Sequence, residues 1–205
     1  MTTLLLIRHG ENDYVKQGRL AGRLAGVHLN ENGRSQANAL AEKLAGSKIK
    51  AVYSSPLERA VETAEPIAQA LNLPVIQRQG LVEVDFGDWQ DQSLKSLRRL
   101  KLWKTVILAP SRTTFPNGES FSQAQYRMQQ EISQIMAEHS GKDLVVCVSH
   151  GDMIKLAVAY YIGLPLDMFQ RFHIAPASIT ALSLNDTGSH LLSLNYDISF
   201  TLPKA

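Results

Sequence analysis

Residues 3–10 read Thr-Leu-Leu-Leu-Ile-Arg-His-Gly, an apolar run that ends in an arginine and a histidine. The run Thr3–Ile7 is short and continuously apolar after its first residue, which is typical of a strand buried on both faces of a sheet. A second such run, Asp143–Val148, leads directly into Ser149-His150-Gly151. Two buried strands that both end at a histidine therefore frame the predicted fold.

Between and after these runs, strands alternate with helices. Further strands are predicted at Ala51–Ser54, at Val75–Ile76, and in a hairpin of Ser178–Leu184 and Leu191–Tyr196 that turns at Asp186–Ser189. Helices are predicted at Asn30–Gly46, at Pro56–Leu71 with Pro56 in the first turn, and at Gly151–Tyr161. The Gly-containing stretch from Gly10 to about Val27 is expected to be irregular. Together they predict an α/β, three-layer fold with a mostly parallel central sheet, an antiparallel edge and helices on both faces.

The segment from about residue 88 to residue 138 lacks strand signals and is helical in tendency. Leu94, Leu97, Leu100 and Trp103 recur every three residues, and a second helix is expected to start near Glu119. A chain of 205 residues fits one domain, residues 1–205, better than two independent ones. We therefore interpret the segment as a helical lid inserted in that domain.

The composition, 44% apolar and 20% charged, is ordinary for a soluble globular protein. A net charge of +2 is too small to imply a nucleic-acid or membrane partner. Cys147 is the single cysteine, so no intrachain disulfide can form, which favours a reducing compartment. The N-terminal apolar run is too short for an export signal, and no segment approaches the roughly 20 apolar residues of a membrane span. The sequence predicts a cytoplasmic protein and leaves homodimer formation open.

The candidate functional residues follow strands. Ligands of open α/β sheets bind beyond the carboxyl ends of the strands. Arg8 and His9 follow the first strand, Arg59 lies in the first turn after the second, and His150 follows the Asp143–Val148 strand. Glu83 comes after the third strand and can join them at the same rim.

This set of side chains suits phosphoryl transfer. Arginine donates paired hydrogen bonds to phosphate oxygens and stays charged, and helix N-termini add further donors. A neutral imidazole can attack phosphorus, and a carboxylic acid with a raised pKa can protonate the leaving group and then activate water. No closely spaced cluster of metal ligands is visible, so the sequence predicts neither a metal nor a cofactor.

Arg8-His9-Gly10-Glu11 after an N-terminal strand resembles the signature of the histidine phosphatase superfamily, the phosphoglycerate-mutase-like fold. The resemblance spans most of the chain and follows the order of the family's motifs. The other similar stretches are Gly18-Arg19-Leu20, Leu29–Gly33, Ser54–Ala60, Glu62-Thr63-Ala64, Glu83 with Phe86–Trp89, Gly118-Glu119-Ser120 and Ser149-His150-Gly151.

The resemblance implies a phosphatase in which His9 is the phosphorylated nucleophile and Glu83 the proton donor. It also implies that Arg8, Arg59 and His150 hold the phosphate oxygens, and that no metal is needed. Further candidates for substrate binding are Asn12, Gly22 and Arg23. The expected partner is a small phosphorylated substrate.

Two departures from the family pattern stand out. Tyr14 and Val15 occupy the positions of a frequent Trp-Asn pair that can touch the phosphate, and Asn12 is a candidate to replace part of that contact. Near the last strands, Ala175-Pro176-Ala177-Ser178 replaces a pattern that often contains an asparagine.

Structural alternatives exist for several of these residues. Arg59 could pair with Glu58 or Glu62 on its own helix, and His150 could be a hydrogen-bonded histidine at a strand end. Asp85 or Asp88 could replace Glu83 as the acid.

Other residues are expected to have structural roles. His28, His139, His173 and His190 are interpreted as structural or surface residues, Cys147 as a small core residue, and the Leu94–Trp103 stripe as packing. From Gln92 to Gly118 there are six basic residues and no acidic one. This basic segment is either a solvated helix face or a lid that attracts anionic substrate.

Three functions compete at this point. A phosphatase passes the phosphoryl group from His9 to water, and a cofactor-dependent phosphoglycerate mutase returns it to a second hydroxyl. The mutase resemblance implies a longer chain with a larger lid, which favours the phosphatase. An inactive phosphate-binding scaffold is the third hypothesis, and the presence of both His9 and Glu83 disfavours it.

Overall fold

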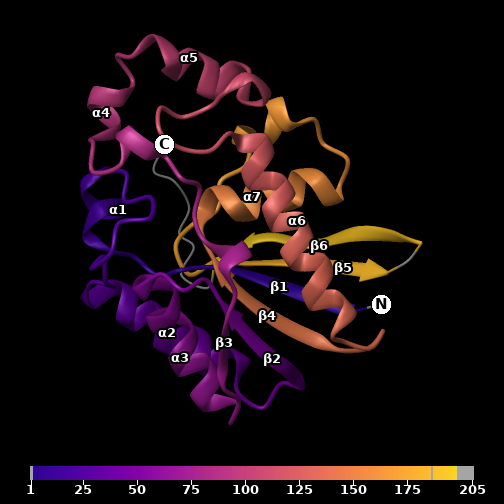
Figure 1. Cartoon of the computed structure of the whole chain (residues 1–205). Helices are drawn as coiled ribbons and strands as arrows, with labels where there is room; N and C mark the ends of the chain where they lie inside the picture. The colour runs from indigo at the N-terminus through magenta and orange to yellow at the C-terminus, as the bar shows by residue number, and fades with distance from the viewer. Residues whose placement is uncertain (1, 186, 198–205) are drawn as a thin grey trace, which may run out of the picture.

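A computed structural model describes residues 2–185 and 187–197. Six strands form one sheet in the order β3-β2-β4-β1-β5-β6, with helices on both faces (Figure 1). The strands are β1 (Thr2–Arg8), β2 (Ile49–Ser54), β3 (Val75–Gln77), β4 (Leu144–Ser149), β5 (Ile179–Asn185) and β6 (Gly188–Tyr196). The α-helices are α1 (Asp13–Gln17), α2 (Glu31–Leu44), α3 (Glu58–Ala70), α4 (Leu94–Leu97), α5 (Lys101–Leu108), α6 (Phe121–Ala137) and α7 (Gly151–Tyr161). Short 3₁₀ helices are η1 (Gln79–Leu81), η2 (Gly87–Trp89), η3 (Pro110–Arg112) and η4 (Leu166–Arg171).

The predicted fold class is confirmed. β1 pairs parallel with β4, and β2 pairs parallel with both β4 and β3. β5 runs antiparallel to β1, and β6 antiparallel to β5, which forms the predicted antiparallel edge. Within the predicted hairpin turn, Asp186 lies outside the described residues, and β6 begins at Gly188, earlier than predicted.

Successive residues of the central strands alternate between two buried layers, because strand side chains point to opposite faces. In β4, Val145 and Cys147 pack in the same cluster as α6 and α7. Val146 and Val148 belong to a second cluster that includes residues of α2 and α3. This explains why the strand sequences are continuously apolar, and it confirms Cys147 as a core residue.

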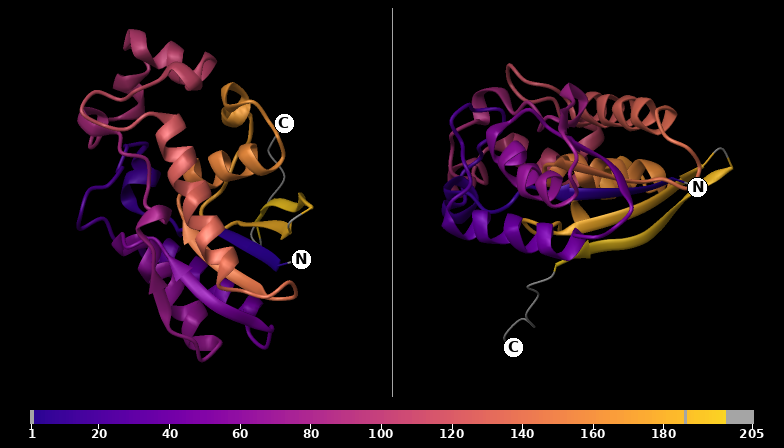
Figure 2. Two further views of the ribbon diagram at one scale, coloured as in Figure 1. Left: turned by 45° about the vertical axis from the view of Figure 1, so that its right-hand side comes forward. Right: turned by 90° about the horizontal axis from the view of Figure 1, so that it is seen from below.

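The segment between residues 88 and 138 has two differently placed parts (Figure 2). α4 and α5 lie beyond one end of the sheet, whereas α6 runs along one face (Figures 1 and 2). Met128, Ile132 and Ile135 of α6 are fully buried in the core. Of the Leu94–Trp103 stripe, Leu94, Leu97 and Trp103 pack against the core, whereas Leu100 is 43% exposed. The stripe is divided between α4 and α5, because the backbone at Leu100 is extended.

Two local predictions were wrong. The stretch after Gly10 was expected to be irregular, but it contains α1, whose N-cap Asn12 accepts a hydrogen bond from Val15 N and which ends at Gly18 with φ 63°. Five residues are too few to show apolar periodicity, so only the caps marked this helix. Pro56 was expected in the first turn of a helix, but α3 has Leu57 as its N-cap.

Candidate active site

The carboxyl ends of β1, β2 and β4 bring three of the predicted residues into contact. Arg8 is the last residue of β1, and His9 follows it. Arg59, the second residue of α3, lies between the two histidines: its Nε is 3.3 Å from His9 Nε2 and its Nη2 is 3.3 Å from His150 Nδ1. The two imidazole rings are 5.2 Å apart, centroid to centroid.

Arg8, His9 and Arg59 border a cavity of about 290 Å³. Of the predicted site residues, those that line it are Arg8, His9, Asn12, Gly22, Arg59 and Glu83. Lining residues that sequence analysis did not select include Val15, Arg19, Leu94, Asp152, Lys155 and His173. The lining includes neither His150, which contacts Arg59, nor Arg23. Asp152 and Lys155 could have been expected here, because α7 begins directly after His150 and its N-terminal residues therefore lie at the rim of the sheet.

Three buried donors around the cavity have no hydrogen-bond partner in the part of the chain that the structure describes: Arg8 Nε, Arg59 Nη1 and Asn12 Nδ2. Other atoms of the same arginines are held, since Arg8 Nη1 donates to Ile174 O at 2.6 Å and Arg59 Nη2 to Gly22 O at 2.7 Å. A buried donor without a partner is unfavourable. Two fixed guanidinium groups and an amide that share one cavity therefore form a site suited to an anion.

The tautomer of His9 follows from its neighbours. His9 Nδ1 lies 2.7 Å from the Gly10 carbonyl oxygen, which can only accept, so Nδ1 carries the proton. Nε2 then has a lone pair, which accepts from Arg59 Nε. Burial, and next the positive charges of Arg59 and Arg8, hold the pKa of His9 well below its usual value. The ring is therefore neutral at physiological pH and presents a nucleophilic nitrogen beside the donors.

His150 also has both ring nitrogens engaged, but it is the opposite tautomer to His9. Nδ1 accepts from Arg59, which can only donate, so Nε2 carries the proton and donates to Ser55 Oγ at 2.8 Å. Burial, followed by the charge of Arg59, lowers the pKa of His150 well below its usual value. His150 is fully buried. It is thus a hydrogen-bonded histidine at a strand end, as in the structural alternative, and it also contacts Arg59.

Glu83 is the only one of the three proposed acids that lines the cavity among the described residues. Burial, and next the negative charge of Asp152, raise its pKa to about 7. Asp85 Oδ1 accepts instead from Gly87 N at 3.0 Å, and Asp88 is exposed and accepts from the side chain of Asn117. A carboxyl group with a pKa near 7 can both donate and accept a proton at neutral pH.

The loop that carries His9 is fixed by two contacts from elsewhere in the chain. Thr63 Oγ1 accepts from Gly10 N at 3.0 Å and donates to Arg59 O at 2.7 Å, which ties the loop to α3. A Cβ on Gly10 would lie 2.6 Å from Gly33 O, so glycine is required where the loop meets α2. Thr63 stood in a quoted motif, but its side-chain role could not be read from the sequence.

The proposed pairing of Arg59 with acids of its own helix is wrong. Glu58 accepts from Gly26 N at 2.9 Å, and Glu62 accepts from Leu29 N at 2.7 Å and pairs with His28. Arg59 is instead 1% exposed. The six basic residues of the 92–118 segment are all exposed, and none of them lines the cavity.

The family model for the histidine phosphatase superfamily (branch 1) matches residues 4–197. The chain belongs to the histidine phosphatase superfamily. Phosphoserine phosphatase 1 of Hydrogenobacter thermophilus is 30% identical over 95% of this chain and 92% of its own length. A crystal structure of the phosphoserine phosphatase of Entamoeba histolytica with 3-phosphoglyceric acid superimposes with a TM-score of 0.87, at 28% identity over 97% of this chain and 98% of that one.

Mutases are also among the superfamily relatives. A 2,3-bisphosphoglycerate-dependent phosphoglycerate mutase of Thermoplasma acidophilum is 29% identical over 90% of this chain and 88% of its own length. The chain therefore spans most of that mutase, so the short length expected to disfavour a mutase does not separate the two activities.

The two departures from the superfamily pattern have different consequences. Val15 places an apolar side chain in the cavity lining, while Asn12 Nδ2 supplies a buried donor there. Ala177 adopts φ 56°, and its N–H donates to the carbonyl oxygens of Arg8 and His9 at 3.0 and 3.2 Å. The Ala175–Ser178 segment thus supports the backbone of the candidate nucleophile.

The described residues contain neither a cluster of metal ligands nor a membrane-spanning helix. Within residues 2–185 and 187–197, no three His, Cys, Asp or Glu side chains are grouped so that they could hold a metal ion. Over the same residues, no helix is long and apolar enough to cross a membrane.

Proposed function

We propose that this histidine phosphatase superfamily member hydrolyses a phosphate monoester through a phosphohistidine at His9. The observation that carries the proposal is the set of unpartnered donors of Arg8, Arg59 and Asn12 around a neutral imidazole. Purified protein should release inorganic phosphate from phosphate monoesters, and a panel of such esters would identify its preferred substrate. Binding of phosphate without any turnover on the panel would support the inactive scaffold instead.

In the first step, the lone pair of His9 Nε2 forms a bond to phosphorus as the bond from phosphorus to the ester oxygen breaks. Arg8 and Arg59 donate to the phosphoryl oxygens, where charge is greatest. The Glu83 carboxyl gives its proton to the departing oxygen, which leaves as a neutral alcohol. The positive end of the α7 helix, whose first residues Gly151 and Asp152 line the cavity, adds to the stabilisation.

In the second step, the Glu83 carboxylate accepts a proton from a water molecule as that water attacks the phosphohistidine. The bond from phosphorus to Nε2 breaks, its electron pair returns to His9, and inorganic phosphate leaves. Nδ1 keeps its proton throughout, because the Gly10 carbonyl holds it. One carboxyl group thus serves as acid and then as base.

We assign His150 the role of a phosphate contact that depends on protonation. Burial and then the positive charge of Arg59 lower its pKa, and the charge of Arg8 adds to the shift. A phosphate dianion offsets those charges and favours the protonated ring, whose Nδ1–H can then donate to a phosphate oxygen.

Replacing Arg59 by lysine should lower kcat/KM by about 100-fold although the charge is kept, which is the cost of removing a strong preorganised donor. A lysine loses the planar group that now contacts His9, Gly22 and His150 together. Steady-state kinetics measure the loss, and thermal unfolding checks that the variant is folded. Wild-type kinetics in Arg59→Lys would contradict a phosphate-holding role.

The second candidate function, a phosphoglycerate mutase, is favoured by the mutase relative and by the same nucleophile. The two activities separate in one assay. With 3-phosphoglycerate as substrate and a bisphosphoglycerate primer, a phosphatase releases inorganic phosphate, whereas a mutase produces the 2-phospho isomer.

We propose that the reaction needs no metal ion, since the arginines, a helix N-terminus and the protonated ring of His150 supply the positive charge around the phosphoryl group. Activity should therefore be unchanged in excess chelator. Hydrolysis is measured after dialysis against EDTA, and again after a divalent ion is added back. Loss of activity in EDTA, with recovery on adding the ion, would overturn metal independence.

We also propose the setting in which the site works. The substrate is a small phosphorylated molecule rather than a nucleic acid or membrane component, and the enzyme acts in the cytoplasm. The chain acts as one domain, and the 88–138 segment, whose Leu94 lines the cavity, covers the site and selects substrate. Homodimer formation stays a prediction, and sedimentation of the purified protein measures it.

A further inference from the structure

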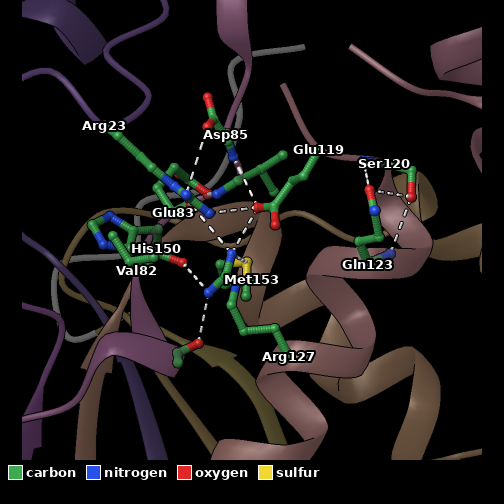
Figure 3. Close-up of polar contacts among 12 residues, drawn as sticks. Arg23, Val82, Glu83, Asp85, Glu119, Ser120, Gln123, Arg127, His150 and Met153 are labelled. Atoms are coloured by element: carbon green, nitrogen blue, oxygen red, sulfur yellow. Dashed lines mark hydrogen bonds and ion pairs between the residues drawn. The ribbon is translucent and has the colours of Figure 1, made fainter. Parts of the chain in front are cut away.

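The motif Gly118-Glu119-Ser120 has no part in the reaction described above, yet Glu119 lies at the centre of a charged cluster (Figure 3). Its Oε1 atom accepts three hydrogen bonds: from Arg23 Nη2 at 2.8 Å, from Arg127 Nη2 at 2.7 Å and from Asp85 N at 2.8 Å. The Glu119 side chain is 16% exposed. Hydrogen bonds between charged partners in such a setting are among the strongest in proteins.

The two arginines converge on the backbone of the candidate acid. Arg23 Nε donates to the Glu83 carbonyl oxygen at 2.8 Å, and Arg127 Nη2 reaches the same oxygen at 3.3 Å. Arg127 Nη1 also donates to Gly80 O at 2.8 Å and to Val82 O at 2.9 Å. Glu83 lies between η1 and η2, outside any helix or strand. The two arginine side chains therefore donate to carbonyl oxygens that, among the described residues, have no partner in a helix or a sheet.

The position of Glu119 itself depends on a close approach of two loops. Glu119 N donates to Asp85 O at 2.9 Å. A Cβ on Gly118 would lie 2.3 Å from that same oxygen, so only glycine allows this contact. The glycine and the glutamate of the motif therefore act together to bring one carboxylate to both arginines.

We propose that Glu119 is a positioning residue that, through Arg23 and Arg127, fixes the Glu83 backbone so that the Glu83 carboxyl faces the leaving oxygen. This assigns Arg23 to the support of the acid rather than to substrate binding. The proposal rests on the proposed function, because it requires that Glu83 transfers the proton.

The test uses the leaving-group dependence of the rate. Glu119→Ala should lower kcat for glycerol phosphate by about 10- to 100-fold, the range expected when a catalytic group is misplaced by a fraction of an ångström to an ångström. KM should stay close to that of the wild type, and the loss for nitrophenyl phosphate should be at most about threefold, because that leaving group needs little protonation. Arg23→Gln should show the same leaving-group-dependent loss of kcat, but a smaller one. Because the Arg23 side chain is partly exposed, this variant replaces Glu119→Ala in the test if Glu119→Ala does not fold.

Glu138→Gln is the matched control. Glu138 caps the opposite end of α6, pairs with Arg78 and accepts from Tyr53 Oη at 2.9 Å, so its loss also removes an arginine–carboxylate pair. It should leave both rates unchanged. If Glu138→Gln lowered the rates for both esters, the effect of Glu119→Ala could be attributed to destabilisation of α6, and the positioning role of Glu119 would be overturned.

The double variant Glu119→Ala with Glu83→Gln distinguishes a role of Glu119 that acts through Glu83 from an effect that is independent of Glu83. If Glu119 acts through Glu83, its replacement should cost nothing further once the acid is absent. Equal losses on both substrates for Glu119→Ala, adding fully to those of Glu83→Gln, would overturn the positioning role. If Glu83→Gln alone shows no leaving-group dependence, the assignment of the acid fails instead.

Discussion

His9→Ala is expected to abolish turnover, with a loss of at least about 10⁴-fold, since removing the nucleophile of a covalent mechanism typically costs that much or more. In our mechanism only His9 forms a bond to phosphorus, and Arg59 Nε lies 3.3 Å from the attacking Nε2. Wild-type protein mixed with a labelled phosphate ester and quenched in alkali should carry label that is stable to base and labile to acid. His9→Ala should carry none.

The control for this experiment is the second histidine of the site, His150. His150→Ala should retain labelling at a reduced rate, because His9 lines the cavity whereas His150 does not, and in our mechanism His150 only contacts the phosphate. Circular dichroism and thermal unfolding establish that both variants are folded. Labelling that persists in His9→Ala and disappears in His150→Ala would show that His150 is the nucleophile and would overturn the mechanism.

The main outline of the fold could be predicted because the strands are buried on both faces and their sequences show it. Leu4–Ile7 and Val145–Val148 are continuously apolar, and each precedes a change to polar residues. Their parallel pairing follows from the helices between them, and the rim of the sheet then places His9, Arg59 and His150 near one another. Resemblance to the superfamily gave the same residues their roles.

The contacts that decide how the site works could not be predicted, because they join residues far apart in sequence. Arg23 was selected as a substrate-binding residue, but its guanidinium pairs with Glu119, 96 positions away. Asp152 was not selected, although its charge helps to raise the pKa of Glu83. Neither contact leaves a periodic or local signal, since each depends on how loops pack over the end of the sheet.

Glu83→Gln is expected to slow glycerol phosphate by about 10²- to 10⁴-fold, the usual contribution of general acid–base catalysis, and to slow nitrophenyl phosphate far less. The alkoxide of glycerol is a poor leaving group that needs a proton, whereas nitrophenolate leaves unaided. The amide keeps the shape of the side chain but cannot donate a carboxyl proton or accept one from water. Phosphohistidine should also persist longer in this variant, and labelling followed by a chase with unlabelled substrate measures its lifetime.

The pH dependence provides a second measurement on the same variant. Burial and Asp152 raise the pKa of Glu83 to about 7, so the carboxyl is protonated below that pH and loses its proton above it. Because the first step needs the protonated form, kcat/KM for glycerol phosphate should fall as the pH rises through about 7 in the wild type. Glu83→Gln should lack this fall, since the amide does not titrate.

Asp152 is the remaining rival for the acid, because it is the other carboxylate in the cavity lining among the described residues. Its side chain lies 3.1 Å from Lys155 Nζ, and its negative charge favours the protonated form of Glu83. Asp152→Asn should therefore move the fall in kcat/KM to lower pH, while the glycerol and nitrophenyl esters are affected alike at pH 5.5, about 1.5 units below the Glu83 pKa of about 7. If Asp152→Asn instead produces the leaving-group-dependent loss and Glu83→Gln does not, the proton comes from Asp152 and Glu83 only shapes the cavity.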